Sequence, residues 1–551
     1  MSGRNISPRI IIGECIQKMK KLISVVLCLV MMLSLLSPTF AFAADEKIPI
    51  VYLRGDGNGI YDADGNVVFP VSYDSSQLPD AVARVVFPHL VKAVLFNQWE
   101  DYYTAFENEI RPIFAGCQLD ENGEPSNGSD ISKKDYVTNQ KNMNTDKVNE
   151  WGNYGLYDYT FWYDWRRDPL YTADLLNEYI EGILKTTGAK KVSLVGKCLG
   201  GSFVLAYLSK YGYDDIRNLA FDSTVGNGCE KFSDIFSGKL KYDGEALERY
   251  KTDNDFLYGK EEEEFLNDFI LASIDLLNEK DVIDLTGKTV DAIYKKLYEG
   301  LTPRLGMAAY GTFPGYWSTV TAEDYQTARD LMFFRNNTGY AEKYAGLIEK
   351  LDAYDTQVRQ RIPEILAGAK QAGINVGILA KYGYQALPIL ESRNKTSDIL
   401  VSLEKASFGA TCADIGTKLS EDYIAEKTEM GLGKYIAPDK QVDASTCLFP
   451  DSTWMIKGMH HDNWAGCNDK LIYRICTQDG YHVNTEPETY PQFMVYSDED
   501  NNVYPMTEEN CNVTNWDAEQ IADHSITSYF RAILKWLQTL FALLKSKIGN
   551  C

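Results

Sequence analysis

The run VSLVGKCLGGSFVLAYL at residues 192–208 constrains the fold of this chain more than any other segment. An apolar run at 192–195 leads into a Gly-x-Cys-x-Gly turn, and a second, longer apolar run follows it. A short apolar run that ends at glycine is typical of a buried strand, and the longer run is typical of a helix. The segment therefore predicts a sharp strand-to-helix turn with Cys198 at its tip.

Strand and helix patterns alternate on both sides of this turn. Strands are expected at 48–53, 157–169, 190–196, 216–223, 374–383 and 452–458, and helices at 170–188 and from the turn to about 211. Such alternation predicts an α/β fold with a doubly wound, mostly parallel sheet. Residues 226–370 are acidic and helical in pattern, which predicts a helical cap inserted between two halves of the core, 44–225 and 371–485. Residues 486–551 form a C-terminal extension.

The N-terminus has the pattern of a secretory signal peptide over residues 1–43. A basic segment precedes about 15 apolar residues, and Ala41-Phe42-Ala43 provides a small-residue cleavage site. A membrane anchor is the alternative, but a spanning helix needs roughly 20 apolar residues. We therefore expect a secreted, extracellular protein. Removing 1–43, which carries a net charge of +4, takes the chain from −23 to −27. A protein this acidic repels phosphates, which excludes nucleic acid as a partner.

Nine cysteines remain after residue 43, which is an odd number. If Cys198 is a free nucleophile, the other eight are enough for four disulfides, which export permits. The spacing does not fix the connectivity; Cys467 and Cys476 are close enough to pair around a short hairpin, and Cys412 and Cys447 could clip the segment between two core strands.

Cys198 has the position of a nucleophile. A residue on a sharp strand-to-helix turn projects clear of the sheet, and glycines on either side let the strand and the helix pack closely. The N–H of Leu199 at the helix start can stabilise an oxyanion. The helix N-terminus and Lys197 would both favour a thiolate. The alternative is a buried, inert cysteine.

A nucleophilic thiol needs a base and an acid, and in α/β-hydrolases they follow the nucleophile in the order acid, histidine. His460 and His461 come directly after the strand at 452–458, where the base is expected. Asp398 lies one loop beyond the strand at 374–383 and is the expected acid, with Asp443 and Asp451 as rivals. The remaining histidines precede the turn or lack a preceding strand: His89, His482 and His524.

Several segments, taken in order, resemble the lecithin:cholesterol acyltransferase family. YDWRRDP at 163–169 is similar to a segment that precedes the family's G-x-S-x-G-G turn. FPGYW at 313–317 resembles its proline-aromatic cap segment, and YGYQALP at 382–388 its Y-G-x-x-x-P stretch. SDILVSLEKAS at 397–407 resembles its acid loop. KGMHH at 457–461 resembles its glycine-x-x-histidine ending, which favours His461 over His460.

The resemblance implies an α/β-hydrolase fold with an inserted helical cap and a catalytic triad of Cys198, Asp398 and His461. The chain departs from the family in two ways. Cysteine replaces the usual serine, and RGDG at 54–57 stands where the family has proline-glycine. We expect the N–H of Asp56 as the oxyanion donor that accompanies Leu199. The turn is also similar to the G-x-C-x-G-G box of polyhydroxyalkanoate synthases, which is an alternative interpretation.

The resemblance thus predicts an acyltransferase, or a lipase or esterase of lipid metabolism, that acts on lipid or other acyl esters through an acyl-thioester. A catalytically decayed binding protein with the same fold is the alternative. No metal or organic cofactor is expected, because no ligand cluster has metal spacing. Asp164 and Arg166 are expected to form a structural ion pair. An amphipathic C-terminal helix is expected to dock on the body or to touch lipid transiently.

Overall fold

The computed structural model describes residues 48–56, 59–70, 96–144, 159–241, 290–335, 339–463 and 466–511, with isolated positions between some of them. The predicted signal peptide, the acidic run at 260–280 and the predicted C-terminal helix lie outside the described residues. Internal contacts divide the chain into two units, Met1–Ile48 and Pro49–Cys551, and the fold described here is that of the second. Within the described ranges, no helix combines the length and the apolar character that crossing a bilayer requires.

An eight-stranded sheet forms the centre of the fold, with the strand order β15-β14-β13-β8-β7-β6-β1-β5. All neighbours pair in parallel except β15, which runs antiparallel to β14. The predicted mostly parallel sheet is therefore confirmed. The strands are β1 Ile50–Leu53, β5 Tyr159–Phe161, β6 Val192–Lys197, β7 Ile216–Asp222, β8 Asn375–Tyr382, β13 Thr453–Lys457, β14 Phe493–Ser497 and β15 Asn502–Pro505.

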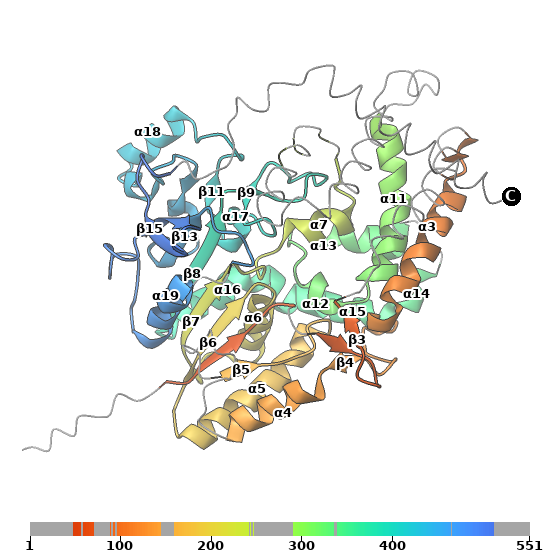
Figure 1. The fold of residues 1–551 in the computed structure, drawn as a ribbon, viewed down its shortest axis with the longest axis horizontal. Helices are drawn as coiled ribbons and strands as arrows, with labels where there is room; N and C mark the ends of the chain where they lie inside the picture. The colour runs from red at the N-terminus through yellow and green to blue at the C-terminus, as the bar shows by residue number, and fades with distance from the viewer. Residues whose placement is uncertain are drawn as a thin grey trace, which may run out of the picture. The chain divides into compact units, whose positions relative to one another are not determined.

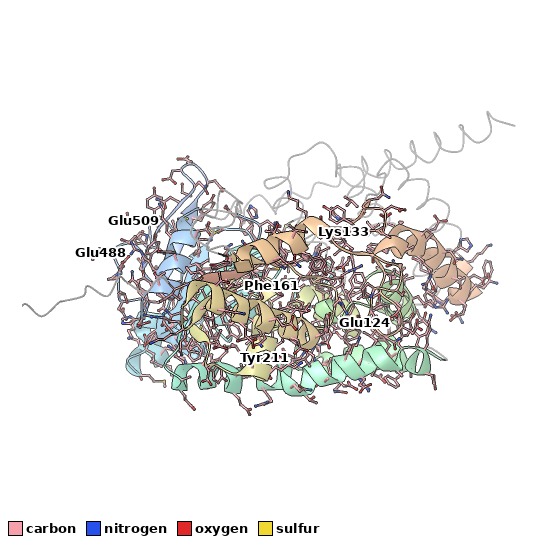
Figure 2. The ribbon with its side chains drawn as sticks, turned by 90° about the horizontal axis from the view of Figure 1, so that it is seen from below. Glu124, Lys133, Phe161, Tyr211, Glu488 and Glu509 are labelled. Atoms are coloured by element: carbon pink, nitrogen blue, oxygen red, sulfur yellow. The ribbon has the colours of Figure 1, made fainter. Side chains whose placement is uncertain are left out.

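Helices cover both faces of this sheet (Figure 1). One face packs against α5 (Pro169–Thr187), α6 (Gly200–Tyr211) and α16 (Ile362–Gln371), and the other against α19 (Gly466–Thr477). Successive side chains of a strand point to opposite faces. Leu194 accordingly lies in the cluster with α5 and α6, while its neighbour Val195 lies in the cluster with α19. Figure 2 shows Phe161 within the packed interior and Glu488 and Glu509 at the periphery.

Smaller elements surround the sheet. A three-stranded antiparallel sheet and two short strand pairs lie in the loops: β2 Ile60–Tyr61, β3 Val67–Phe69 and β4 Asp130–Ile131; β9 Tyr384–Gln385 with β10 Thr396–Ser397; β11 Thr411–Cys412 with β12 Val442–Asp443. Further helices are α4 Lys133–Asn144, α17 Leu403–Ala406 and α18 Glu421–Glu429.

Helices from two separate parts of the chain form the cover beside the sheet. The predicted cap at 226–370 contributes α7 Glu230–Ser237, α11 Val290–Ala309, α12 Pro314–Trp317, α13 Tyr325–Arg329, α14 Tyr340–Lys343 and α15 Ala345–Gln357. The helix α3 (Trp99–Phe114), from the predicted core half, packs along α11 (Figure 1). The end of the predicted cap, in turn, belongs to the sheet layer, because α16 packs on β8 and α6.

The C-terminal boundary and one cysteine pair differ from the prediction. The sheet continues past residue 485, since β14 and β15 add two strands to it. Cys467 and Cys476 both lie on α19 rather than on a hairpin. Nine residues of helix separate them by about 13 Å, and a disulfide requires Cα atoms closer than about 7 Å. This pair is therefore wrong, and all eight cysteines among the described residues are free thiols.

Candidate active site

Three glycines allow the turn between β6 and α6 to close. A Cβ on Gly200 would lie 2.2 Å from the carbonyl oxygen of Leu53 at the end of β1. A Cβ on Gly201 would lie 1.8 Å from Thr224 Oγ1, and one on Gly196 would lie 2.8 Å from the Cα of Gly201. A side chain at Gly200 or Gly196 would require the backbone to move, and one at Gly201 would displace the Thr224 side chain, so the helix approaches the sheet this closely only with glycine.

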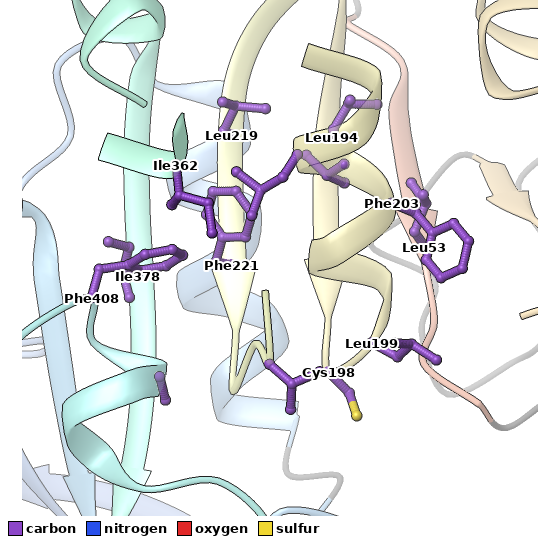
Figure 3. Close-up of a cluster of buried hydrophobic side chains, with 14 of the residues drawn as sticks. Leu53, Leu194, Cys198, Leu199, Phe203, Leu219, Phe221, Ile362, Ile378 and Phe408 are labelled. Atoms are coloured by element: carbon purple, nitrogen blue, oxygen red, sulfur yellow. The ribbon is translucent and has the colours of Figure 1, made fainter. Parts of the chain in front are cut away.

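Cys198 occupies the tip of this turn with a φ of 53°. A left-handed backbone is costly for a residue other than glycine, typically by about 1–3 kcal/mol, and such strain gathers at functional sites. Two residues near the site also have a positive φ, Ser223 after β7 and Ile399 beside the predicted acid. Figure 3 shows the Cys198 sulfur beyond the end of β6, at the edge of the apolar cluster. The strained turn thus presents the thiol at the carboxyl edge of the sheet.

The predicted acid and base are in direct contact. The ring Nδ1 of His461 lies 2.7 Å from Oδ2 of Asp398, and the backbone N–H of His461 donates to the Asp398 carbonyl at 2.8 Å. The other carboxylate oxygen accepts from the N–H groups of Leu400 and Val401 at 3.1 and 2.9 Å. Asp398 is fully buried. These contacts fix the carboxylate and, through it, the orientation of the imidazole.

The second ring nitrogen of His461 faces the thiol. Burial disfavours the charged imidazolium, but Asp398 and Cys198 outweigh it and hold the pKa of His461 well above its usual value. Nε2 is buried and makes no hydrogen bond of standard geometry with the described residues. The Cys198 thiol nonetheless lies close enough to His461 to raise its pKa, both through its charge and through a side-chain hydrogen bond. Catalytic hydrogen bonds are often loose before substrate binds.

Both predicted oxyanion donors adjoin the thiol. A Cβ on Gly55 would lie 2.9 Å from Cys198 Cβ and 3.0 Å from Sγ, so the loop after β1 touches the nucleophile. Within the described part of the chain, neither the N–H of Leu199 nor that of Asp56 donates a hydrogen bond. The Asp56 side chain is held apart, since its Oδ2 accepts from the Tyr316 hydroxyl at 2.9 Å. Among the described residues these two backbone N–H groups therefore lack a partner, and both belong to segments that adjoin Cys198.

A cavity of about 310 Å³ opens on Cys198. Its walls come from the turn, from the loop after β1 and from the helices α7, α11 and α12. Most of the lining is apolar, and the residues that line it include Val225, Phe232, Ile235, Phe236, Leu305, Ala309 and Leu400. Pockets of this size and lining bind the apolar part of small ligands. The cover helices thus supply an apolar chamber next to the thiol.

The rival residues have other partners. Asp443 Oδ2 accepts from the Tyr423 hydroxyl at 2.8 Å, and Asp451 Oδ1 accepts from the Tyr435 hydroxyl at 2.7 Å. Burial lowers the pKa of His460, which has no contact with Asp398 comparable to that of His461. His482 is exposed. His89 precedes the turn in sequence, and His524 lies outside the described residues.

The predicted ion pair near the site is confirmed as structural. Arg166 Nε donates to Asp164 Oδ1 at 2.9 Å and one terminal nitrogen donates to Oδ2 at 2.6 Å, both in the interior. The guanidinium also donates to the carbonyl oxygens of Cys117 and Ser129. It therefore ties the segment after β5 to the loop between α3 and α4.

Two charged residues near the site were missed. Asp222 and Lys381 lie at the ends of β7 and β8, and Asp222 binds Lys197, the residue before the nucleophile. The signal for them is that three apolar strands, VSLVGK, NLAFD and GILAK, each end in a charge. In the described ranges, no group of three or more histidine, cysteine or acidic side chains is arranged to hold a metal ion.

Comparisons with known proteins show no family match and a weak structural similarity. No family model matches the chain. No curated protein matches it either. Among solved structures, a chain from the crystal structure of the Tle4–Tli4 complex is similar at 12% identity and a TM-score of 0.22, over 61% of this chain and 75% of that chain.

Proposed function

We propose that this protein is an enzyme of the α/β-hydrolase fold that transfers or hydrolyses acyl groups through a thioester on Cys198. The observation that carries the proposal is the contact between Asp398 and His461 at the same edge of the sheet as the strained Cys198. The order along the chain is nucleophile, acid, histidine, and each residue follows a different parallel strand. This order supports the α/β-hydrolase fold.

Acyl transfer would begin at the thiolate. Sγ of Cys198 attacks the carbonyl carbon of an ester, and the carbonyl electron pair moves onto oxygen, where the N–H groups of Leu199 and Asp56 donate to it. When the tetrahedral intermediate collapses, the carbon–oxygen bond to the alcohol breaks and Nε2 of His461 gives that oxygen its proton. The products are a free alcohol and an acyl-thioester, with neutral His461.

The second half-reaction reverses these roles. A water, alcohol or amine gives a proton to Nε2 of His461 as it attacks the thioester carbon. The carbon–sulfur bond then breaks and restores the Cys198 thiolate. A thioester is more reactive toward alcohols and amines than an oxygen ester is, so this chemistry suits transfer as well as hydrolysis. The apolar cavity favours substrates with an acyl chain.

The test is the mass of the intact protein after incubation with phospholipid, acylglycerol and thioester donors. We expect an added acyl mass on the wild type and none on Cys198→Ala. Cys198→Ser should fold normally and lose most activity, because a hydroxyl depends wholly on its base. An alanine variant as active as the wild type would make Cys198 structural. A serine variant faster than the wild type would favour the decayed-enzyme alternative.

Location and partners belong to the same proposal. Residues 1–43 would direct the chain out of the cell, and its substrate would be a lipid or another acyl ester. The C-terminal segment would touch the lipid surface transiently. Vesicle binding by the intact chain, lost when the chain is cut after residue 524, would support this contact, whereas unchanged binding would contradict it.

A further inference from the structure

Three charged side chains lie at the carboxyl ends of three adjacent strands. Lys197 ends β6, Asp222 ends β7 opposite Lys197, and Lys381 lies one residue before the end of β8. Because side chains alternate along a strand, all three point to the face that α19 covers. They share this face with residues of the same parity in the cluster that includes Val195, Ala220 and Leu379.

One carboxylate is shared between two lysines. Asp222 Oδ2 lies 3.5 Å from Lys197 Nζ, and Asp222 Oδ1 lies 3.6 Å from Lys381 Nζ. All three side chains are buried, and Lys381 is 0% exposed. Nζ of Lys381 makes no hydrogen bond with the described residues. With all three groups ionised, the cluster carries a net charge of +1 in the interior, where an uncompensated charge is costly.

The candidate active site carries the matching negative charge. Cys198 follows Lys197 directly, and the electrostatic effect of His461 reaches Asp222. If Cys198 is a thiolate and His461 an imidazolium, these two charges cancel and Asp398 leaves a net −1. The cluster supplies the +1 that makes the whole buried assembly neutral.

Other titratable groups face this assembly from the elements around it. The charge of Asp469 on α19 acts to raise the pKa of Lys197. His460, beyond the end of β13, is affected by two charges, since Asp462 acts to raise its pKa and Lys381 to lower it. The charge of Cys198 contributes to raising the pKa of Tyr163 and of Tyr316. Further titratable groups line the cavity or lie on α19: Asp56, Cys229, Lys231 and Tyr310 in the cavity, and Cys467, Lys470, Tyr473, Arg474 and Cys476 on the helix. None of these groups forms an ion pair with Lys381. Among the described residues, its ion-pair partner is Asp222 alone.

We propose that Lys197, Asp222 and Lys381 are positioning residues that maintain Cys198 as a thiolate and His461 as an imidazolium. This inference rests on the proposed nucleophile but not on the identity of its substrate. A thiolate is charged at rest and needs a permanent positive charge nearby, whereas a serine hydroxyl is neutral at rest and does not. The cluster would thus adapt this site to cysteine.

The test is the pH profile of Cys198 alkylation by iodoacetamide, followed by intact mass on the full chain. Lys381→Met removes a positive charge and should raise the midpoint pH by about one unit, a rate about tenfold lower on the acidic side. Asp222→Asn removes a negative charge at equal volume and should lower the midpoint. The double variant should return near the wild type. A purely structural role would not give shifts of opposite sign.

The matched control is Lys457→Met. Lys457 is also buried at a strand end, but it points to the other face and pairs with Asp439 at 3.0 Å. Its substitution should leave the midpoint unchanged. If Lys381→Met does not fold, Asp222→Asn alone decides the matter. An unchanged midpoint in the variants that fold, or shifts of the same sign, would overturn the inference. Shifts of opposite sign without any acyl-enzyme would uphold it and count against the proposed function.

Discussion

Substituting Asp398 by asparagine separates the structural role of this residue from its chemical role. Oδ1 accepts two backbone N–H groups, from Leu400 and Val401. In Asp398→Asn the amide oxygen must keep that place, because an NH₂ group there would leave both donors unsatisfied. The amide NH₂ then faces Nδ1 of His461, where Oδ2 lies 2.7 Å away in the native protein.

This geometry dictates the size of the effect. Because the amide NH₂ introduced by Asp398→Asn is a donor, Nδ1 of His461 must accept a hydrogen bond from it. The proton of the neutral ring then lies on Nε2 and points at the thiol. Nε2 can no longer take a proton from Cys198 or from an incoming acceptor. An equivalent substitution in a serine protease lowers kcat about 10⁴-fold, which corresponds to about 5.5 kcal/mol. We expect a loss of this order in acyl-enzyme formation, with a folded protein.

The assay is the rate of acyl-enzyme formation by intact mass, alongside urea unfolding. Asp451→Asn is the control, since the Asp451 carboxylate is also hydrogen-bonded, to the Tyr435 hydroxyl, but lies on the surface. It should change the acylation rate by less than about twofold. If Asp398→Asn acylates within tenfold of the wild type, Asp398 does not orient the base. Asp222, the other carboxylate whose field reaches His461, would then be the candidate.

Three further predictions follow from single contacts. His461→Ala should slow acylation by about 10³-fold or more and His460→Ala far less; the reverse ranking in the mass assay would move the base to His460. Gly200→Ala should destabilise the protein by about 1–3 kcal/mol in urea unfolding and impair acylation, because its methyl would meet the last carbonyl of β1; Gly433→Ala, whose nearest neighbours are the Thr428 hydroxyl at 3.2 Å and Cα at 3.5 Å, should do neither. Burial raises the pKa of Asp234 from 3.8 to about 6, so the folded state retains a proton that the unfolded chain releases above pH 3.8. Asp234 should therefore lower the free energy of unfolding by about 3 kcal/mol as the pH rises from 4 through 6, measured as the difference in pH dependence between the wild type and Asp234→Asn, and the same pH dependence in both would refute this.

The strands around the turn could be predicted because each is a short apolar run that ends at glycine or a charge. The run at 192–195 begins β6, and the helix expected to reach about residue 211 is α6, Gly200–Tyr211. Apolar residues on a buried parallel strand face two packed layers, so their pattern is continuous and easy to recognise. The same reasoning gives β8 and β13.

The elements that were missed depend on contacts far apart in sequence. The run FMVYS of β14 is too short to distinguish a strand from a helix segment by periodicity. The pairing of α3 with α11 joins segments about 190 residues apart, and neither sequence shows it. In α19 the signal was present, since Cys467, Leu471, Ile475 and Cys476 have helical spacing and are all buried. The distance between Cys467 and Cys476 alone, without the apolar residues between them, predicts a hairpin instead.

The location of the candidate site follows from the strand order. From β1 the chain moves to β5 on one side and then to β6 on the other, so the order reverses between β1 and β6. Loops diverge at such a point and leave a crevice at the carboxyl edge of the sheet. Cys198 and Asp56 lie close together there. Asp398 follows β8 along the chain, and His461 follows β13. Order along the chain therefore identifies these residues without any contact information.

If the proposed role of the charged cluster is right, serine would not simply replace cysteine at this site. With a neutral hydroxyl at residue 198, the net +1 of Lys197, Asp222 and Lys381 would face Asp398 and His461 alone. That charge would oppose the imidazolium that must form as the hydroxyl loses its proton. With a thiolate, the same charge stabilises the resting state and leaves His461 protonated, ready to donate to the leaving group. On this proposal, Cys198→Ser should recover activity only when Lys381→Met accompanies it, and a serine variant that gains nothing from that second change would refute the electrostatic argument.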